Sequence, residues 1–436
     1  MKTLIRQARL IDPASQTDRM VDVAIAAGRI LAIGTIPADF QPNKDIDAKG
    51  NWLVPGLVDL CARTREPGHE HEGMLASEMA AAVAGGVTSL VCPPDTDPVL
   101  DEPGLVEMLR FRASKLHHAR LFPLGALTRG LDGQVLTEMN ELTQAGCVGF
   151  GQADRAMKDT QVLQRALQYA ATFGYTVWLR PQDAHLGLGV AASGPLATRM
   201  GLSGVPVAAE TIALHTLFAL MRSTGARVHL CRISSAAGVE LVRQAKAEGL
   251  PLTCDVSIHS LHLTDLDMGY FDSRARLSPP LRQQADRQAL RQALADGTID
   301  ALVSDHHPVQ GDEKALPFAE AEPGATGVEL LLSLALKWAQ DEGLSALQAL
   351  SVITDRPARI LRQSSPSIAA GIGRIAVGEV ADVCLLDSQE VWQLDPNGLR
   401  SQGRHTPFAF DCTGISLPGK VRATCVAGHW AWPEPA

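Results

Sequence analysis

Five units of one kind follow each other in the middle of the chain, each with a helical stretch, a glycine and a short apolar run. The helical stretches are 76–84, 161–173, 211–223, 237–248 and 287–295, and the apolar runs are 87–92, 175–179, 227–231, 251–254 and 299–303. Strands with one helix between each pair must run parallel. This number of repeats favours a closed (β/α) barrel over an open sheet, and we place it at residues 53–372.

The two ends of the chain have a different pattern. Polar and apolar side chains alternate in short pieces between residues 2 and 52, and Asp-Pro and Gly turns separate the pieces. This alternation predicts a small antiparallel sheet. A matching pattern returns in 373–375, 381–386 and 420–432.

Composition excludes several functional classes. The net charge is -9 without a basic run, so no nucleic-acid partner is expected. No apolar stretch reaches the roughly 18 residues of a membrane span, and the start does not resemble a signal peptide, so we expect a cytoplasmic protein without a membrane partner. The cysteines form no C-x-x-C pair and are expected to be reduced, mostly core residues; they are Cys61, Cys92, Cys147, Cys231, Cys254, Cys384, Cys412 and Cys425.

In a parallel barrel, the residues just after each strand converge on one mouth and form the site. Here they are Cys61, Arg63, Arg65, Asp95, Gln152, Arg180, Arg232, Asp255, His259, Asp305, His306 and His307. A hydrolase with two zinc ions needs several imidazoles and carboxylates at such positions. This set contains few of them.

The stretch 54–68 resembles the P-G-x-[VI]-D-x-H-x-H-x-R-E-P-G segment of the dihydroorotases, a family of metal-dependent amidohydrolases. In that family two imidazoles bind zinc and the arginine holds a substrate carboxylate. Cys61 and Arg63 stand at the two His positions here, whereas Arg65 and the following Glu-Pro-Gly are unchanged. The resemblance implies an α/β fold, a (β/α)8 TIM-type barrel at 53–372 with a small β-sandwich domain formed by 1–52 plus 373–436.

Other segments extend the resemblance over nearly the whole chain. The family's Asn corresponds to Asp95, its bridging ligand to Gln152, and its third and fourth His to Arg180 and Arg232. Asp305 keeps the last carboxylate of the metal site, although Val309 replaces the His that closes this motif. The departures from the family pattern are therefore concentrated at the barrel mouth.

These replacements predict the loss of the metal. A guanidinium has no lone pair, so Arg63, Arg180 and Arg232 cannot ligate zinc and would repel it. We expect no catalytic residue, no metal ligand and no cofactor, and a protein that is not an enzyme. Arg65, Asp95 and His259 would remain as a vestigial substrate pocket. Asp305 is predicted to pair with at least one of the three arginines, because buried charges persist when paired.

The resemblance also implies a role. Some bacteria have an inactive dihydroorotase-like subunit that assembles with aspartate transcarbamoylase, and this chain resembles such a noncatalytic subunit of pyrimidine biosynthesis. We therefore expect a hetero-oligomer with the aspartate transcarbamoylase catalytic chain, and also a homo-oligomer.

Two alternatives stay open. One is an active cyclic-amide hydrolase that binds one metal through Asp305, His306 or His307 and Cys61. The other is a binding protein that holds an anion with Arg63, Arg65, Arg180 and Arg232. His69 and His71 suggest a displaced zinc pair, but a solvated loop is the preferred interpretation of that segment.

Overall fold

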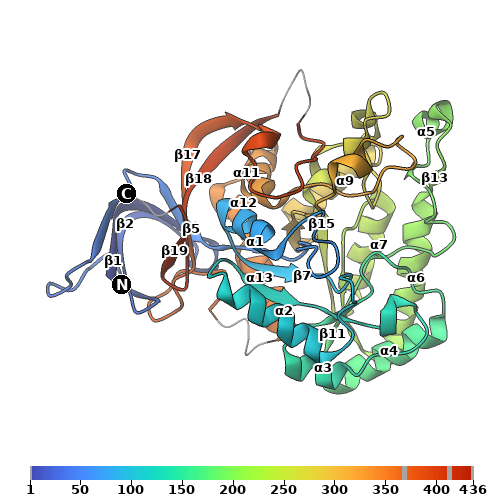
Figure 1. The fold of residues 1–436 in the computed structure, drawn as a ribbon, viewed down its shortest axis with the longest axis horizontal. Helices are drawn as coiled ribbons and strands as arrows, with labels where there is room; N and C mark the ends of the chain where they lie inside the picture. The colour runs from blue at the N-terminus through green and yellow to red at the C-terminus, as the bar shows by residue number, and fades with distance from the viewer. Residues whose placement is uncertain (1, 366–370, 410–414, 434–436) are drawn as a thin grey trace.

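The computed structural model describes residues 2–365, 371–409 and 415–433. Figure 1 shows a β domain at the left, made of the blue and dark red ends of the chain, and an α/β barrel at the right. Among the described residues, no helix has the length and apolar character needed to span a membrane.

The β domain is built from both ends of the chain. Its eight-stranded sheet has the order β19-β18-β17-β5-β1-β2-β3, with β4 paired to β1. The strands are β1 (Lys2–Asp12), β2 (Thr17–Ala26), β3 (Arg29–Ile33), β4 (Lys44–Asp47), β5 (Trp52–Pro55), β17 (Val383–Gln393), β18 (Ser416–Val426) and β19 (His429–Trp432). β5 pairs antiparallel with β17, with Leu53 opposite Leu385. Buried side chains of both ends, among them Ile5 and Val383, share one core.

The barrel is a ring of parallel strands. Its strands are β6 (Leu57–Asp59), β7 (Val87–Cys92), β8 (Arg120–Pro123) with β9 (Gly125–Ala126), β10 (Phe150–Gly151), β11 (Thr176–Leu179), β14 (Arg227–Leu230), β15 (Leu252–Ser257) and β16 (Ala301–Val303). They form two parallel sheets, and a parallel bridge between Ala62 and His306 joins the ends of β6 and β16. The predicted fold class, a TIM-type barrel with a small terminal β domain, is confirmed.

Helices cover the outside of the ring (Figure 1). They are α1 (Leu75–Ala84), α2 (Pro103–Lys115), α3 (Met139–Ala145), α4 (Thr160–Phe173), α6 (Val207–Thr224), α7 (Ala236–Ala247), α9 (Gln284–Asp296), α11 (Leu331–Glu342), α12 (Ala346–Ser351) and α13 (Asp355–Ser364). Short elements lie in the connections: α5 (Pro195–Met200), α8 (Ile258–His262), α10 (Gly311–Lys314), β12 (Ala191–Ala192) and β13 (Gly204–Val205).

Helix α4 illustrates how local sequence sets these units. The Asp159 side chain accepts the backbone N–H groups of Gln161 and Val162, which would otherwise lack partners in the first turn. Gly174 ends the helix with φ 72, a conformation that is costly for residues with a Cβ. The chain then turns directly into β11.

The apolar run 53–60, where we placed the start of the barrel, is divided between the two parts of the molecule. β5 belongs to the β domain, and β6 begins the barrel only at Leu57. Gly56 lies between them, and a Cβ there would lie 2.2 Å from Thr88 Oγ1. A side chain at this position would therefore collide with β7, so the crossing between sheet and barrel requires glycine.

Seven cysteines lie in the described part of the chain; all are free, and all but Cys231 are buried. This agrees with the predicted reduced core residues. Cys412 lies outside the described residues.

Candidate functional site

The barrel mouth brings together the charged residues that follow the strands. Arg63 comes after β6, Asp95 after β7, Arg180 after β11, Arg232 after β14 and Asp305 after β16. Arg63 and Arg232 are almost fully buried. The expected convergence of these residues on one site is therefore present.

Asp154, which sequence reasoning missed, joins three of these residues. Its carboxylate lies 2.8 Å from Arg63 Nη2 and 3.0 Å from Arg180 Nε, and it also forms an ion pair with Arg232 Nη2. Arg180 Nη2 donates to the Asp154 carbonyl at 3.0 Å. The only indication of Asp154 in the sequence was its place two residues beyond Gln152, at the end of the same strand.

Two further carboxylates complete the pairing. Arg232 Nη1 donates to Asp305 Oδ1 at 3.0 Å, which confirms that Asp305 pairs with one of the three arginines. Arg63 Nε donates to Asp95 at 2.8 Å. The Cys61 thiol lies 3.8 Å from Asp305 Oδ1. Three arginines are therefore balanced by Asp95, Asp154 and Asp305 in one network.

The electrostatics of this network follow from burial and pairing. Burial acts to raise the pKa of Asp154, but Arg232, Arg63 and Arg180 outweigh it and hold this pKa well below its usual value. Burial acts to lower the pKa of Arg63, but Asp95 and Asp154 outweigh it and raise this pKa. At Arg180 burial prevails, and the pKa is lowered. These shifts favour a mouth made of ionised pairs.

The remaining mouth residues have local partners. Gln152 is bonded to Thr128 through both its amide oxygen and its amide nitrogen. His259 Nδ1 lies 2.9 Å from Ser257 Oγ and 4.0 Å from Asp305 Oδ2, while its buried Nε2 has no partner. Burial lowers the pKa of His259 to about 4, so the ring is neutral near pH 7.

The adjacent histidines after β16 point to different surroundings. His306 Nε2 lies 2.8 Å from Glu78 Oε2, and its Nδ1 accepts the N–H of Gly327 at 3.2 Å. Both ring nitrogens of His306 are therefore engaged away from Asp305. His307 is neutral, because burial lowers its pKa well below the usual value, and Arg63 and Arg65 add to this shift.

A zinc ion does not fit the ligand positions of the family pattern. Arg63, Arg180 and Arg232 offer no lone pair, and the Gln152 amide is already bonded to Thr128. The alternative set of Asp305, Cys61 and His306 or His307 is also not grouped. Within the described residues, sets of three side chains with ligand atoms within 4.8 Å of each other occur at two other places.

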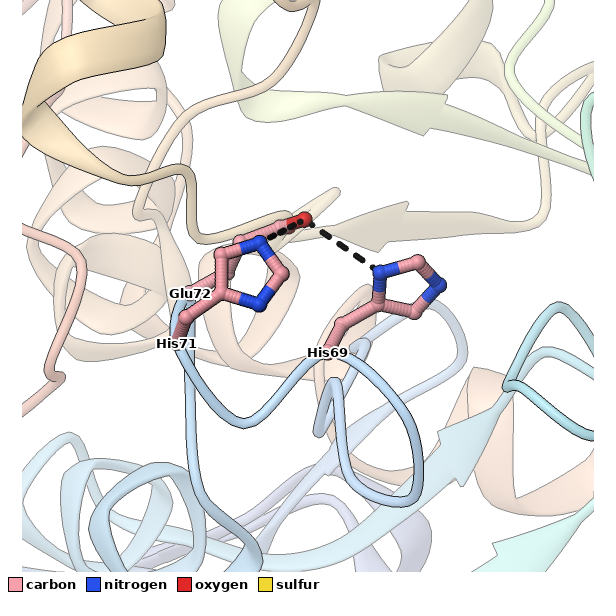
Figure 2. Close-up of side chains that lie close together, drawn as sticks. All are labelled: His69, His71 and Glu72. Atoms are coloured by element: carbon pink, nitrogen blue, oxygen red, sulfur yellow. Dashed lines mark ion pairs between the residues drawn. The ribbon is translucent and has the colours of Figure 1, made fainter.

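The first set lies on the loop after β6, directly beyond the unchanged Arg-Glu-Pro-Gly segment. Figure 2 shows His69 and His71 turned toward the Glu72 carboxylate. His69 Nδ1 and His71 Nε2 each lie 3.5 Å from Glu72 Oε1, and the other carboxylate oxygen forms an ion pair with Arg65. Glu72 is 4% exposed, whereas the side chain of His71 is 50% exposed. The solvated loop that we expected thus includes a buried carboxylate that faces both imidazoles.

The second set is His229, Cys231 and Asp255, below the mouth. His229 lies 2.9 Å from Asp255 Oδ2 through Nε2 and 2.8 Å from Thr253 Oγ1 through Nδ1. Asp255 Oδ1 accepts the backbone N–H of Arg232 at 2.7 Å. The ring nitrogens of His229 and both oxygens of Asp255 therefore already have hydrogen-bond partners. We infer that this group positions the backbone of Arg232.

Comparisons with known proteins agree with this architecture. The Dihydro-orotase-like family matches residues 50–237, and the Amidohydrolase family matches residues 207–431. A "Dihydroorotase-like protein" of Pseudomonas aeruginosa is 45% identical over 98% of this chain and 99% of its own length. A "Dihydroorotase" of Anaeromyxobacter dehalogenans is 37% identical over 98% of this chain and 96% of its own. The solved L-hydantoinase (dihydropyrimidinase) from Arthrobacter aurescens has a TM-score of 0.86 at 23% identity, covering 98% and 95% of the two chains.

These relatives correct one prediction. We expected the chain not to be an enzyme, and this is wrong: a relative that matches along 98% of the chain is named dihydroorotase. The prediction considered only the family's ligand positions. The arginines exclude zinc from the family's usual ligand positions. His69, His71 and Glu72 form a different group of possible ligands, on the loop after β6. The chain belongs to the dihydroorotase-like family of amidohydrolases.

Proposed function

We propose that this protein is a dihydroorotase-like hydrolase of cyclic amides with a rearranged metal site, formed by His69, His71 and Glu72. The observation that carries the proposal is the grouping of these three side chains beside Arg65. Two imidazoles and a carboxylate form a common ligand set of catalytic zinc, which keeps one position open for water or substrate.

The surroundings of the three residues support this assignment. Arg65 holds one oxygen of Glu72 and leaves the other directed at both imidazoles. An ion pair of this kind to the far oxygen of a carboxylate fixes the orientation of that carboxylate before it binds a metal. The half-exposed His71 leaves access from solvent. A metal held here would supply Lewis acidity toward the amide carbonyl and a more acidic bound water.

The test measures metal content and turnover of the purified full-length protein. We expect about one zinc per chain and hydrolysis of dihydroorotate. The His69→Ala and His71→Ala variants should lose metal affinity and activity by at least tenfold, because each removes one of three protein ligands. His185→Ala, at an exposed histidine outside this set, is the matched control. Absence of bound metal and of turnover in the unmodified protein would refute the proposal.

We also propose that the chain assembles with the catalytic chain of aspartate transcarbamoylase, in the cytoplasm and as a homo-oligomer within that assembly. The family resemblance suggests this partner. Co-expression followed by size-exclusion chromatography should show co-elution and altered carbamoyl transfer. Separate elution with unchanged transfer would contradict the assembly.

A further inference from the structure

A pocket of about 740 Å³ lies between the barrel and the β domain. One wall is formed by α2, by residues 117–119 and by β8, and the other by the turn between β18 and β19. The mouth lies beyond the carboxyl ends of the strands, whereas this wall contains the start of β8. The pocket is therefore at the opposite end of the barrel, at a domain junction of the kind where small-molecule sites are common.

An ion pair holds the two walls of this pocket together. Arg120 Nη2, in β8, donates to Asp382 Oδ1 at 3.0 Å, and the same oxygen accepts the backbone N–H of Ala427 at 2.8 Å. The side chain of Asp382 is 3% exposed. Asp382 thus joins the barrel to the turn after β18, so the shape of the pocket is set before a ligand enters.

Arg110 of α2 supplies a cation to the pocket that no carboxylate neutralises. Its Nη1 donates to the Ala145 carbonyl at 2.6 Å, and no described residue forms an ion pair with it. The guanidinium lies against Gly146, where a Cβ would be 2.1 Å from Nη1. The end of α3 therefore fixes this guanidinium, and its remaining N–H groups are available to a ligand.

Two more side chains of α2 face the same pocket. Glu107 lies three and four residues before Arg110 and Phe111, so the three share one face of the helix. The Glu107 carboxylate has no partner among the described residues and can accept hydrogen bonds. The Phe111 side chain is 63% exposed, and Lys115 lies over one face of its ring, 5.0 Å from the centroid. The other face can stack on a planar group.

His118 adds an unused hydrogen-bonding atom. Its Nδ1 is buried and has no partner. Burial lowers the pKa of His118 and the neighbouring His117 adds to this shift, so the ring is neutral near pH 7. An unpaired buried polar atom costs free energy, which a ligand group would recover. A hydroxyl can pair with either tautomer of the ring, because it both donates and accepts.

These groups together define the ligand. A simple anion would leave Glu107 and Phe111 without a role, and an uncharged ring would leave Arg110 without one. The volume lies within the range of roughly 300–1,000 Å³ for small-molecule pockets, so there is room for a base, a sugar and a phosphate at once.

We propose that this pocket binds a nucleoside monophosphate. Arg110 holds the phosphate, Phe111 stacks on the base, an amino group of the base donates to Glu107, and a sugar hydroxyl pairs with His118. The inference goes beyond the proposed hydrolase function and does not depend on it, because the pocket and the group of His69, His71 and Glu72 lie at opposite ends of the barrel.

The test is isothermal titration calorimetry of the full chain with the 5′-monophosphates of guanosine, adenosine and cytidine, whose bases carry an amino group. We expect one saturable site for at least one of them. The matching nucleoside and inorganic phosphate should each bind at least tenfold more weakly, because each lacks part of the contacts.

Two variants locate the binding. Arg110→Gln should weaken nucleotide binding roughly tenfold or more, because it removes a charged hydrogen-bond donor, and should leave nucleoside binding unchanged. Phe111→Ala should weaken nucleotide and nucleoside alike by about tenfold, because both stack on the ring. The exposed Phe111 side chain contributes little to the core, so this variant tests the proposal even if Arg110→Gln is unstable.

The matched control is Arg243→Gln, which removes an exposed arginine on α7 that pairs with Glu240 and Asp296. Its affinity should equal that of the unmodified chain. The proposal is overturned if none of the three nucleotides binds, if the nucleoside or inorganic phosphate binds as tightly as the nucleotide, or if Phe111→Ala or a folded Arg110→Gln binds as tightly as the unmodified chain. A nucleotide held at the barrel mouth or on a metal ion would give this last result.

Discussion

Asp154 is the residue whose replacement tests the charge network most directly. Its carboxylate contacts Arg63, Arg180 and Arg232 and is 27% exposed. Asp154→Asn keeps the shape of the side chain and removes the negative charge. Three neighbouring guanidiniums would then be balanced only by Asp95 and Asp305.

The expected magnitude follows from these contacts. One ion pair at about 4 Å is worth roughly 4 kcal/mol at an effective dielectric of 20, and the carboxylate takes part in three such pairs. The cost of removing the charges from water offsets most of this attraction, so breaking a buried pair costs about 3–5 kcal/mol. Partial exposure of Asp154 and the two remaining carboxylates place the loss near the lower end. We expect Asp154→Asn to lower the free energy of unfolding by about 3 kcal/mol.

Urea denaturation followed by circular dichroism measures this loss from the midpoint, provided that the slope is unchanged. The matched control is Asp18→Asn, at a partly exposed carboxylate paired with Arg9 at 2.7 Å. Such surface pairs contribute about 1 kcal/mol or less. If Asp154→Asn costs no more than this control, the mouth is not held together by ion pairs and our account of it fails.

Three further predictions concern other parts of the molecule. His259 and His262 are buried, and burial lowers their pKa values from 6.5 to about 4 and about 3. As the pH falls, the two histidines bind protons in the unfolded chain before they do so in the folded one. The free energy of unfolding should therefore decrease as the pH drops from 6.5 toward 4, by roughly 3 kcal/mol for His259 alone. The His259→Asn variant should show a weaker pH dependence when denaturation is measured at pH 6.5, 5 and 4. Gly56→Ala should lower the free energy of unfolding by about 1–3 kcal/mol, because the new Cβ would collide with β7. Gly104→Ala, where a Cβ meets no atom within 4 Å, is the control and should cause no such loss. Equal denaturation midpoints for the two variants would exclude the collision. Glu78→Gln should cost about 2 kcal/mol, because the Glu78 carboxylate is bonded to His306 and to Ser401 at 2.8 and 2.6 Å, and an unchanged melting temperature would contradict this.

Much of the barrel could be predicted because its signals are local. Four of the five predicted apolar runs correspond closely to β7, β11, β14 and β15, and the fifth contains β16. The barrel strands that sequence analysis did not identify are β8, β9 and β10, of which the last two have two residues each. So short a strand has no readable alternation, and only pairing with its neighbours defines it.

The site was less predictable. The positions of Arg63, Arg180 and Arg232 after their strands indicated convergence. That Asp305 pairs with at least one of these arginines followed from charge alone, but that the partner is Arg232 did not. The role of Asp154 did not follow either, because its side chain reaches three strand ends only through the course of the loop after β10. Likewise, His69 and His71 faced Glu72 only once the loop had folded back on Arg65.

The amino-acid sequence by itself determined the parallel barrel, because a helix, a glycine and a strand recur in order and one helix between successive strands makes those strands parallel. It also determined that three former ligand positions carry side chains without lone pairs, which is a property of the residue and not of its surroundings. Only the tertiary structure decided which carboxylates neutralise those cations, where imidazoles and a carboxylate meet, and which arginines keep unpaired donors. The physical reason is that charge pairing and ligand grouping depend on distances of a few ångströms between loops, and spacing along the chain does not specify these distances.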